Sequence, residues 1–276
     1  MSTSLRQGPA ATRPLRLLCN WAGRIAVLAL LALNSATADT NELKVVDSTD
    51  APWPSIGRVN VAGYRTTSMC TGTLIAPGLV LTAAHCLYNR STGRPFPLDD
   101  LIFVAGVRRD EYSALLEPAC FKTNGAYEPK QQPKLRDVRN DVGLIVLKKA
   151  SSLPPVPPLS PEEAASLTRE TRFQSVGYRR SRRFLPTVVP ACRVLGTQEE
   201  SWVTDCATES GASGGPLLVE TAKGLRVAGI MSARIDDARS AIVPFFEWQE
   251  LLADPVCPPA EKTSAPNLRS SLPPGN

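Results

Sequence analysis

CTGTLIAPGLVLTAAHC, Cys70–Cys86, is the stretch of sequence that most strongly indicates the fold. Its second half, GLVLTAAHC, is typical of a short strand, and a cysteine stands at each end of the segment. The segment also holds His85, the only histidine among 276 residues. A lone histidine is more often a packed or surface residue than a catalytic one, so the rest of the chain has to decide its role.

The remainder of the chain favours short strands over long helices. The 18 glycines and 25 prolines are spread along the whole length, and the apolar runs are short. Residues 153–159, LPPVPPL, contain four prolines, which suit neither a helix interior nor a central strand, so we expect an extended linker there. Strand-rich halves on both sides of this linker predict an all-β fold of two packed β-barrels. The expected strands are LIFVAGV, VGLIVLK, RFQSVGY, TVVPACRVL, SWVTDCA, GGPLLVE and GLRVAGIMS.

Two short helices are expected in the second half of the chain. The sequence SPEE at 160–163 places a serine at the N-cap, a proline at the first helical position and a glutamate three residues after the serine, which makes a capping box. Residues 244–254, PFFEWQELLAD, are the strongest helix candidate and end before Pro255. Between the last two expected strands, AKG at 222–224 predicts a hairpin turn.

Residues 1–38 are typical of a secretory signal peptide. They contain four arginines and no acidic residue, an apolar core at 25–33, and small residues at Ala36 and Ala38. The alternative is an uncleaved membrane anchor, which is disfavoured because so short an apolar core cannot cross a bilayer. We therefore expect cleavage after Ala38 and export to the periplasm or the medium.

Removal of the signal changes both the charge and the cysteine count. The whole chain has a net charge of +5, and since residues 1–38 carry four of its positive charges, the remainder has a net charge of +1. So small a charge gives no reason to expect nucleic-acid binding. Six of the seven cysteines remain, and an even number in an exported chain favours disulfides over metal ligands. With one histidine and no Cys-x-x-Cys pair, we expect no metal site and no other cofactor.

A second stretch, GASGGPLL at 211–218, surrounds Ser213 with glycines. Such a turn occurs both as the nucleophile elbow of lipases and esterases and as the serine loop of chymotrypsin-like proteases. In the lipase order the histidine follows the serine, but His85 precedes Ser213 by 128 residues. The acid should lie between them, and Asp141 opens the apolar strand NDVGLIVL, where a carboxylate can be buried beside the histidine. The order His, Asp, Ser is that of chymotrypsin-like proteases.

Taken together, these motifs resemble those of the chymotrypsin/trypsin family of serine proteases. CTGTLIAPGLVLTAAHC resembles its histidine strand, NDVGLIVL its aspartate strand, GASGGPLL its serine loop, and VAGIMS at 227–232 the strand that lines its substrate cleft. The likeness covers about residues 45–254, and three motifs in the right order make it very specific. The short loops and the missing activation sequence are more similar to bacterial secreted relatives, including glutamyl endopeptidases.

The resemblance implies two six-stranded antiparallel β-barrels, a short C-terminal helix and an active site between the barrels. It implies that Ser213 is the nucleophile, that His85 takes and returns its proton, and that Asp141 orients the imidazole. The backbone N–H groups of Gly211 and Ser213 would form the oxyanion hole. Ser232 would hydrogen-bond Asp141 or line the cleft.

The substrate pocket departs from that of trypsin. Ala207 stands where trypsin carries the aspartate that binds lysine or arginine side chains. Met231 lies near the place of the histidine that reads glutamate in glutamyl endopeptidases. The preferred substrate residue is therefore left open. The residues expected to line the pocket are Ala207, Thr208, Met231, Ser232 and Ala233.

A second departure is Ala212, the residue before the serine. Trypsin-like enzymes carry an aspartate there, which pairs with the amino terminus freed by activation. Because alanine cannot form this ion pair, we expect activity that does not depend on an amino terminus processed at one position.

The resemblance also implies a Cys70–Cys86 disulfide, which would hold the turn that carries His85. Cys192 and Cys206 flank two neighbouring expected strands, so we expect them to pair. This leaves Cys120 with Cys257, although six cysteines allow many other pairings.

The expected organisation has four parts along the chain. They are a signal peptide at 1–38, a flexible leader or short pro-segment at 39–50, a chymotrypsin-like protease domain at 51–255 and a disordered Pro/Ser-rich tail at 256–276. Within the protease domain we expect barrel one at about 51–150, the linker at 151–160 and barrel two at about 161–255.

The main alternative is a catalytically silent binding protein on the same scaffold. Such relatives usually lack a triad residue, whereas all three are present here. A quality-control protease with a peptide-binding accessory domain is disfavoured because the tail after Cys257 is too short to form one. For a protease, the expected partners are polypeptide substrates and a protein protease inhibitor, without nucleic acid and without membrane anchoring after signal cleavage. We expect the basic run YRRSRRF at 178–184 to be a solvated loop rather than an anion-binding exosite or a self-cleavage site.

Overall fold

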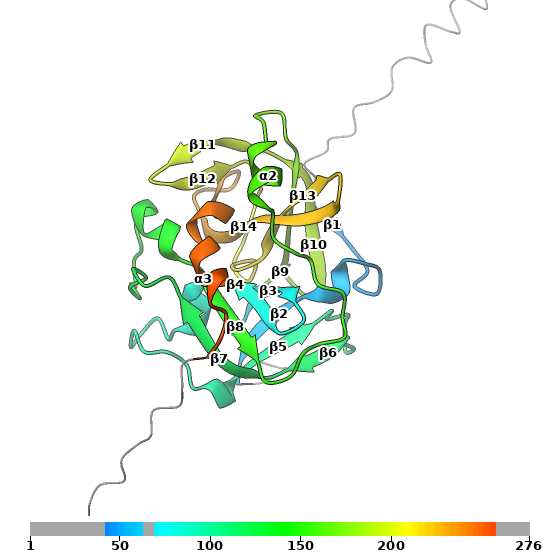
Figure 1. The fold of residues 1–276 in the computed structure, drawn as a ribbon, viewed down its shortest axis with the longest axis vertical. Coiled ribbons are helices and arrows are strands. Elements are labelled where there is room, and N and C mark those ends of the chain that lie inside the picture. Colours follow the sequence, from blue (N-terminus) through cyan, green and yellow to red (C-terminus); the bar gives the residue numbers. More distant parts are fainter. Residues whose placement is uncertain (1–41, 63–68, 258–276) are drawn as a thin grey trace, which may run out of the picture. The chain divides into compact units, whose positions relative to one another are not determined.

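The structure of the chain, a computed structural model, describes residues 42–62 and 69–257. These residues form two antiparallel β-sheets with a few short helices (Figure 1). The predicted signal peptide at 1–38, and the part of the predicted tail at 258–276, lie outside the described residues.

The first sheet has seven strands in the order β6-β5-β2-β3-β4-β8-β7. Their bounds are β2 Ile56–Val61, β3 Met69–Ala76, β4 Leu79–Thr82, β5 Leu101–Ala105, β6 Ala114–Leu116, β7 Pro118–Thr123 and β8 Gly143–Leu147. The segment quoted at the outset forms the β3–β4 hairpin, in which Thr73 faces Leu81 across the ladder. The apolar side chains of the sheet bury one another in a hydrophobic cluster that includes Val59, Leu74, Val80, Leu101, Phe103 and Ile145.

The second sheet has eight strands in the order β1-β10-β9-β13-β14-β15-β12-β11. Their bounds are β1 Lys44–Val45, β9 Phe173–Arg179, β10 Arg182–Cys192, β11 Val194–Gln198, β12 Ser201–Thr204, β13 Pro216–Thr221, β14 Gly224–Arg234 and β15 Ser240–Pro244. The predicted hairpin at AKG is present, because β13 and β14 pair up to Thr221 and Gly224 on either side of the turn.

This architecture confirms the predicted all-β, chymotrypsin-like fold of two β-barrels. The sheets hold seven and eight strands instead of six each, because short segments such as the two-residue β1 and the three-residue β6 pair with their edges. The two sheets meet where β9 packs against β2 and β3. Strand β3, the first strand of the hairpin that leads to His85, therefore lies at the junction of the two halves.

The proline-rich linker is hydrogen-bonded to both sheets. Its two buried non-proline residues keep their N–H groups, and each uses that donor: Val156 N–H bonds Leu74 O of β3 at 2.9 Å, and Leu159 N–H bonds Val227 O of β14 at 3.1 Å. Proline lacks this donor, so the positions of Val156 and Leu159 among the prolines decide where the linker can donate a hydrogen bond to each sheet.

The predicted capping box is present and starts the first described helix, α2 Pro161–Ala165. Ser160 Oγ accepts a hydrogen bond from Glu163 N at 3.2 Å, and Glu163 Oε2 accepts one from Ser160 N at 2.8 Å. The C-terminal helix is interrupted at Trp248, which is fully buried, and so only α3 Gln249–Ala253 is α-helical. The remaining helices are short 3-10 turns: η1 Trp53–Ser55, η2 Ala84–Leu87, η3 Leu98–Asp100, η4 Leu135–Asn140 and η5 Phe245–Glu247.

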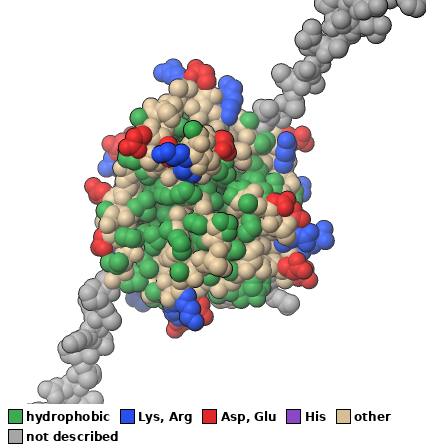
Figure 2. Space-filling view, turned by 45° about the vertical axis from the view of Figure 1, so that its right-hand side comes forward, with side chains coloured by type: hydrophobic (Ala, Val, Ile, Leu, Met, Phe, Trp, Pro, Cys, Tyr) green, Lys and Arg blue, Asp and Glu red, His purple; other side chains and the backbone are tan. Residues whose placement is uncertain are grey.

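Apolar side chains also reach the surface. Figure 2 shows one face on which they gather across the middle, with charged side chains mainly around the rim.

Among the residues that the structure describes, no helix has the length and hydropathy needed to cross a bilayer.

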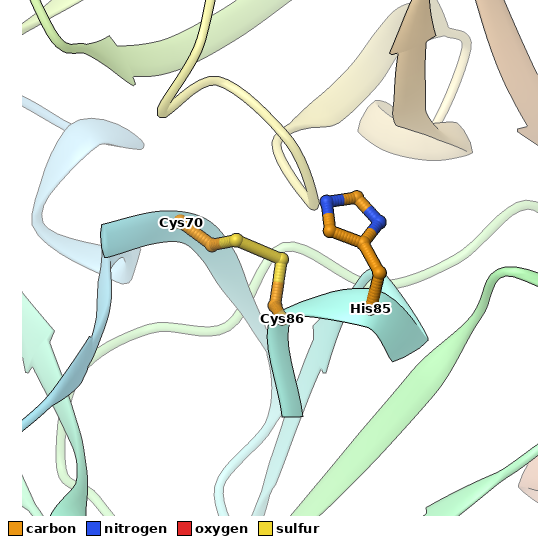
Figure 3. A group of neighbouring side chains, drawn as sticks. All are labelled: Cys70, His85 and Cys86. Carbon is orange, nitrogen blue, oxygen red and sulfur yellow. A yellow bond between two sulfur atoms is a disulfide. The ribbon is translucent and has the colours of Figure 1, made fainter. Parts of the chain in front are cut away.

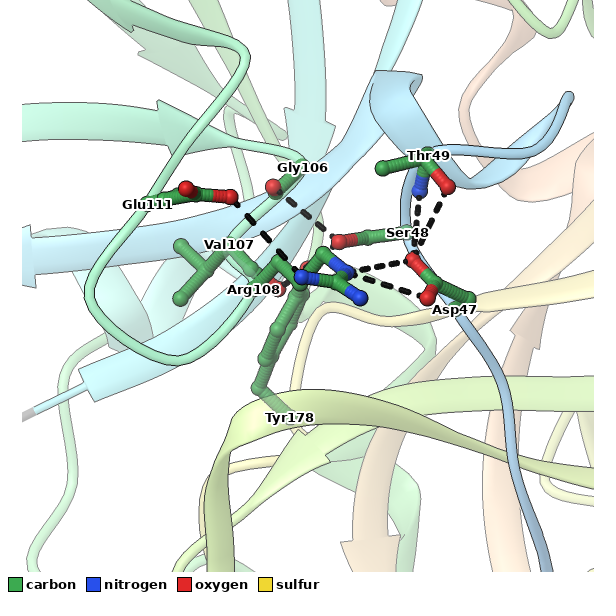
Figure 4. Close-up of polar contacts among 8 residues, drawn as sticks. All are labelled: Asp47, Ser48, Thr49, Gly106, Val107, Arg108, Glu111 and Tyr178. Atoms are coloured by element: carbon green, nitrogen blue, oxygen red, sulfur yellow. Dashed lines mark hydrogen bonds and ion pairs between the residues drawn. The ribbon is translucent and has the colours of Figure 1, made fainter.

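The leader segment, residues 44–50, is packed against the domain, which differs from the flexible leader expected at 39–50 (Figure 4). Its strand β1 pairs with β10 at the edge of the second sheet. Ser48 is almost fully buried and donates toward Gly106 O and Val107 O of the loop after β5, at 3.2 and 3.1 Å. The segment thus connects the second sheet to the first. Its hydrogen-bond partners lie 58 and 59 residues further along the chain, so no local sequence pattern predicts them.

An exposed ion pair holds the same segment. Asp47 Oδ1 lies 2.7 Å from Arg108 Nε, and Asp47 also accepts hydrogen bonds from the backbone and hydroxyl of Thr49. The Arg108 hydrogen bond, followed by those of Thr49, holds the pKa of Asp47 well below its usual range. Because the folded-state pKa is depressed, this contact stabilises the folded state above the ordinary aspartate pKa, and the contribution is lost as pH falls through the lowered value.

We predict that Asp47→Asn lowers the melting temperature at pH 7 and speeds proteolysis of the leader segment severalfold. The deficit relative to the unmodified protein should shrink as the pH is lowered below about 4, where the unfolded state begins to take up the proton. Thermal denaturation between pH 3 and pH 7 measures it. Asp50→Asn is the matched control, since Asp50 is exposed and makes only backbone hydrogen bonds among the described residues. An equal, pH-independent effect of both substitutions would rule out the ion pair as the cause.

Candidate active site

His85 lies in η2, the turn that follows β4. The fully buried Ala83 and Ala84 let this turn pack closely, and a side chain at Gly143 would come within 2.6 Å of Leu87 Cδ1. The Cys70–Cys86 disulfide fastens the turn to β3, and Figure 3 shows this bridge beside the imidazole. The disulfide thus closes the segment Cys70–Cys86 into a loop, and this fixes the position of the His85 backbone.

Asp141 follows η4 and precedes β8, so its carboxylate lies at the end of the first sheet. Oδ2 lies 2.7 Å from His85 Nδ1, and Oδ1 accepts a hydrogen bond from His85 N at 2.8 Å. Ser232 Oγ of β14 donates to Oδ2 at 2.5 Å. A carboxylate in this position favours the tautomer with the proton on Nδ1, which leaves the lone pair on Nε2.

The serine loop, residues 211–215, requires its glycines. Gly211 and Gly214 have φ values of +97° and +78°, a region that other residues adopt only with strain. A Cβ at Gly214 would come within 2.2 Å of Thr82 Oγ1, and one at Gly215 within 2.1 Å of Val176 O. The loop can approach Thr82 of the first sheet and Val176 of the second this closely only without those side chains.

Thr71, a residue that the sequence analysis did not single out, holds this loop in place. Its N–H donates to Ser213 O and its hydroxyl to Gly211 O, both at 2.8 Å, while the same hydroxyl accepts from Tyr178 N at 2.9 Å. Its own carbonyl accepts from Thr82 Oγ1 at 2.8 Å. The signal in the sequence was a threonine next to a cysteine in an otherwise apolar strand, which is too common to be recognised without the fold.

The backbone around Ser213 offers two free donors. Among the described residues, neither the N–H of Gly211 nor that of Ser213 donates a hydrogen bond. The neighbouring N–H of Gly214 bonds Met231 O at 2.7 Å, and that of Gly215 bonds Ala212 O at 2.9 Å. The N–H groups that follow Ser213 in the loop are thus hydrogen-bonded. The N–H groups of Gly211 and Ser213, which the sequence analysis proposed as donors to an oxyanion, remain available.

The expected residues line one cavity of about 570 Å³, here called the β14-side pocket. Its lining includes His85, Asp141, Ser213, Thr208, Met231, Ser232 and Ala233. Ala207, the fifth residue expected in the substrate pocket, is absent from the lining. Its carbonyl instead accepts a hydrogen bond from the buried Arg179 at 2.6 Å.

Two buried polar atoms beside this pocket have no partner. Within residues 42–62 and 69–257, neither His85 Nε2 nor Thr208 Oγ1 makes a hydrogen bond. An unsatisfied buried polar atom costs about 1–3 kcal/mol, and such atoms call for an explanation. Both atoms belong to residues that line the same cavity, where a ligand can supply the missing bonds.

The basic run at 178–184 was expected to be a solvated loop, but its first two residues, Tyr178 and Arg179, are buried at the end of β9. Burial lowers the pKa of Arg179, whose head donates to Thr187 Oγ1 and to Ala207 O. Tyr127, which the sequence analysis did not single out, lines the β14-side pocket as a neutral phenol, because burial, and then the charge of Asp141, raises its pKa. Both effects depend on tertiary packing, which the local sequence does not reveal.

The structure joins the six cysteines in the three expected pairs: Cys70–Cys86, Cys120–Cys257 and Cys192–Cys206. Disulfides of this kind are compatible with export to an oxidising compartment. The two groups of metal-ligand atom types found among the described residues each contain one of these disulfides. Each group therefore retains only one other side chain, a histidine or an aspartate, to offer to an ion.

A comparison with known families agrees with this arrangement. Residues 70–230 match the family model described as "Trypsin-like peptidase domain". The match covers more than half of the chain and spans all three motifs. The chain belongs to the trypsin-like peptidase family, a family of serine peptidases that act on polypeptides.

We predict that Thr71→Val lowers the free energy of unfolding by about 1–3 kcal/mol, because it removes the hydroxyl that donates to the buried Gly211 O. It should also slow the labelling of Ser213 by a serine-reactive phosphonate about tenfold, since the loop loses one of its two hydrogen bonds to residue 71, while the bond from the backbone N–H to Ser213 O remains. Urea denaturation and mass spectrometry of the labelled protein measure the two effects.

Thr73→Val in the same strand is the matched control for this substitution. Thr73 is fully buried, but its hydroxyl has no partner among the described residues. Its replacement should therefore be neutral or stabilising and leave labelling unchanged. If both valine variants behaved alike, the anchoring role of Thr71 would be disproved.

Proposed function

We propose that this protein is an exported serine endopeptidase that hydrolyses peptide bonds through a Ser-His-Asp triad and an acyl-enzyme. The observation that carries the proposal is the Asp141–His85 pair at 2.7 Å, with Nε2 of the imidazole buried, unbonded among the described residues and beside Ser213 in the lining of one cavity. The membership in the trypsin-like peptidase family supports the same chemistry. We further propose that residues 1–38 direct export to the periplasm or the medium and are removed.

The proposed reaction begins at Ser213. Its Oγ attacks the carbonyl carbon of the substrate while His85 Nε2 takes the hydroxyl proton. Asp141 stabilises the imidazolium through Nδ1, and Ser232 and the backbone of His85 keep the carboxylate in place. This follows the template known for this class of enzyme.

The negative charge that develops on the substrate oxygen is met by the N–H groups of Gly211 and Ser213. One such donor contributes about 10²–10³ in rate, because it is already oriented before the charge appears. Collapse of the tetrahedral intermediate breaks the C–N bond, and His85 gives its proton to the leaving amine. Water, activated by the same imidazole, then hydrolyses the acyl-enzyme and frees Ser213.

The alternative is a catalytically silent protein that binds polypeptides with the same cleft. The two functions differ in one feature, the reactivity of Ser213. A silent protein needs no accepting nitrogen beside the serine and no free N–H groups in its loop. Both features support the enzyme.

A protein protease inhibitor is a further partner that an exported peptidase of this kind would meet.

We predict that purified residues 39–276 cleave peptides in a mixed library and that Ser213→Ala abolishes these cuts. Loss of the nucleophile should lower the rate at least about 10³-fold, because the base and the oxyanion donors alone are a poor catalyst. Mass spectrometry of the products gives the cut sites and the preferred residue before each cut.

A serine-reactive phosphonate is the independent check of this experiment. It should label Ser213 in the unmodified protein, and Asp141→Asn should slow the labelling because the imidazole loses its orienting partner. Peptide binding without cuts and without labelling would favour the silent protein.

The amino terminus provides a further prediction. Ala212 is buried, and a Cβ at Gly177 would lie 2.8 Å from its side chain, so this site holds no carboxylate for a freed amino group. Proteins that begin at Asp39, Glu42 or Lys44 should therefore have kcat/KM values within about twofold of one another. Activity that appeared only after cleavage following Lys44 would contradict this.

A further inference from the structure

A second cavity meets the β14-side pocket at the proposed nucleophile. This disulfide-side pocket has a volume of about 620 Å³ and shares four lining residues with the first: Ser213, His85, Arg90 and Ser210. Its other lining residues include Cys70, Cys86, Tyr88, Phe96 and Arg180. A polypeptide that crosses the serine must extend in both directions from the bond to be cut. We take the β14-side pocket as the acyl side, because four of the five residues expected to line the substrate pocket are in its lining. The disulfide-side pocket then receives the leaving-group side.

The two arginines reach this pocket from separate and well-anchored turns. Arg90 follows η2, in a turn where Asn89 N bonds Arg94 O at 2.8 Å. Arg180 lies between β9 and β10, and its own N–H bonds Ser210 O at 2.8 Å, directly before the serine loop. Both side chains are exposed, so they can bind a ligand without paying for desolvation of a buried charge.

The pocket contains no opposite charge. None of its lining residues is an aspartate or a glutamate, and neither Arg90 nor Arg180 forms an ion pair or a side-chain hydrogen bond within the described part of the chain. Residues 63–68, which follow the lining residue Ala62, read GYRTTS and also contain no acid. The positive charge is therefore available to a ligand.

The β14-side pocket is different, because its charges compensate one another. Lys130 lies 2.7 Å from Asp137 and 3.5 Å from Glu128, and all three residues line that pocket. Arg234, also in its lining, is paired with Asp237. Arg90 lines both pockets, so Arg180 is the unpaired cation found on the disulfide side alone, and acidic side chains occur only in the lining of the β14-side pocket.

We infer that the disulfide-side pocket selects substrates with acidic residues in the first positions after the cleaved bond. Guanidinium groups bind carboxylates through two parallel hydrogen bonds. At physiological salt, charges attract over about 8 Å, so both arginines act only on residues close to the bond. This assignment also gives a role to part of the basic run at 178–184, which was expected to be merely solvated. The inference rests on the proposed function only for the direction in which the substrate lies.

The test uses internally quenched peptides with one acyl-side sequence, chosen from the cleavage profile, and Glu-Glu, Gln-Gln or Lys-Lys after the cut. In low salt, kcat/KM for Glu-Glu should exceed that for Gln-Gln about tenfold, with Lys-Lys lowest, and the ratio should fall severalfold in 0.5 M NaCl, a concentration about three times physiological. Arg90→Gln/Arg180→Gln should bring the ratio to about one. Because each ratio is taken within one protein, a general loss of activity cancels.

Arg169→Gln/Arg172→Gln is the matched control, since it removes the same charge from exposed positions outside both pockets. It should keep the tenfold preference. A ratio near one in the unmodified protein, or a preference that survives in Arg90→Gln/Arg180→Gln, would overturn the inference.

A binding measurement separates this inference from the proposed function. Ser213→Ala protein is titrated with fluorescein-labelled peptides that begin Glu-Glu or Gln-Gln, and anisotropy reports the affinity. The Glu-Glu peptide should bind about tenfold more tightly, and the advantage should vanish in the double glutamine variant. Equal affinities would refute the acidic preference whether or not the protein hydrolyses peptides. A preference without hydrolysis would sustain the pocket and refute the peptidase.

Discussion

The hydrogen bonds of Thr71 are the constraint on which the proposed site depends. His85 and Asp141 come from the first sheet, whereas Ser213 stands on a loop of the second. Thr71 bonds that loop at two carbonyls from within β3, so the loop is held to the sheet that carries the other two residues. The glycines of the loop permit this approach, and the Cys70–Cys86 bridge fixes the strand from which it is made. The loop that carries Ser213, the proposed nucleophile, is therefore held to the sheet that carries His85, the proposed base.

This arrangement bears on how an active conformation is maintained. In trypsin-like enzymes an aspartate before the serine pairs with a freed amino terminus, and here Ala212 occupies that position. The leader segment is instead tied to the loop after β5 and to β10, through Ser48 and β1. The serine loop receives its support from Thr71, a residue present in the chain from the start.

The sequence was sufficient where short segments carry both the fold and the chemistry. The three motifs, the capping box at Ser160 and the linker prolines predicted their local structures because the determining residues are neighbours in the chain. It was insufficient where partners are distant: Thr71 bonds Gly211 across 140 residues, and Ser48 bonds Val107 across 59. The leader was expected to be flexible because its polar sequence contains no partner of its own.

The unsatisfied atoms of the cleft complete the same physical picture. A folded chain normally pairs its buried polar groups, and leaving His85 Nε2 and Thr208 Oγ1 unpaired lowers stability. The disulfides and the Thr71 hydrogen bonds counter this cost, because they hold the cleft open against a collapse that would satisfy those atoms. The unpaired arginines on the disulfide side follow the same logic, since their partners are missing from the described chain and have to come from what binds there. In this cleft, the polar and charged groups that have no partner within the described chain are the groups that bind the ligand in our proposal.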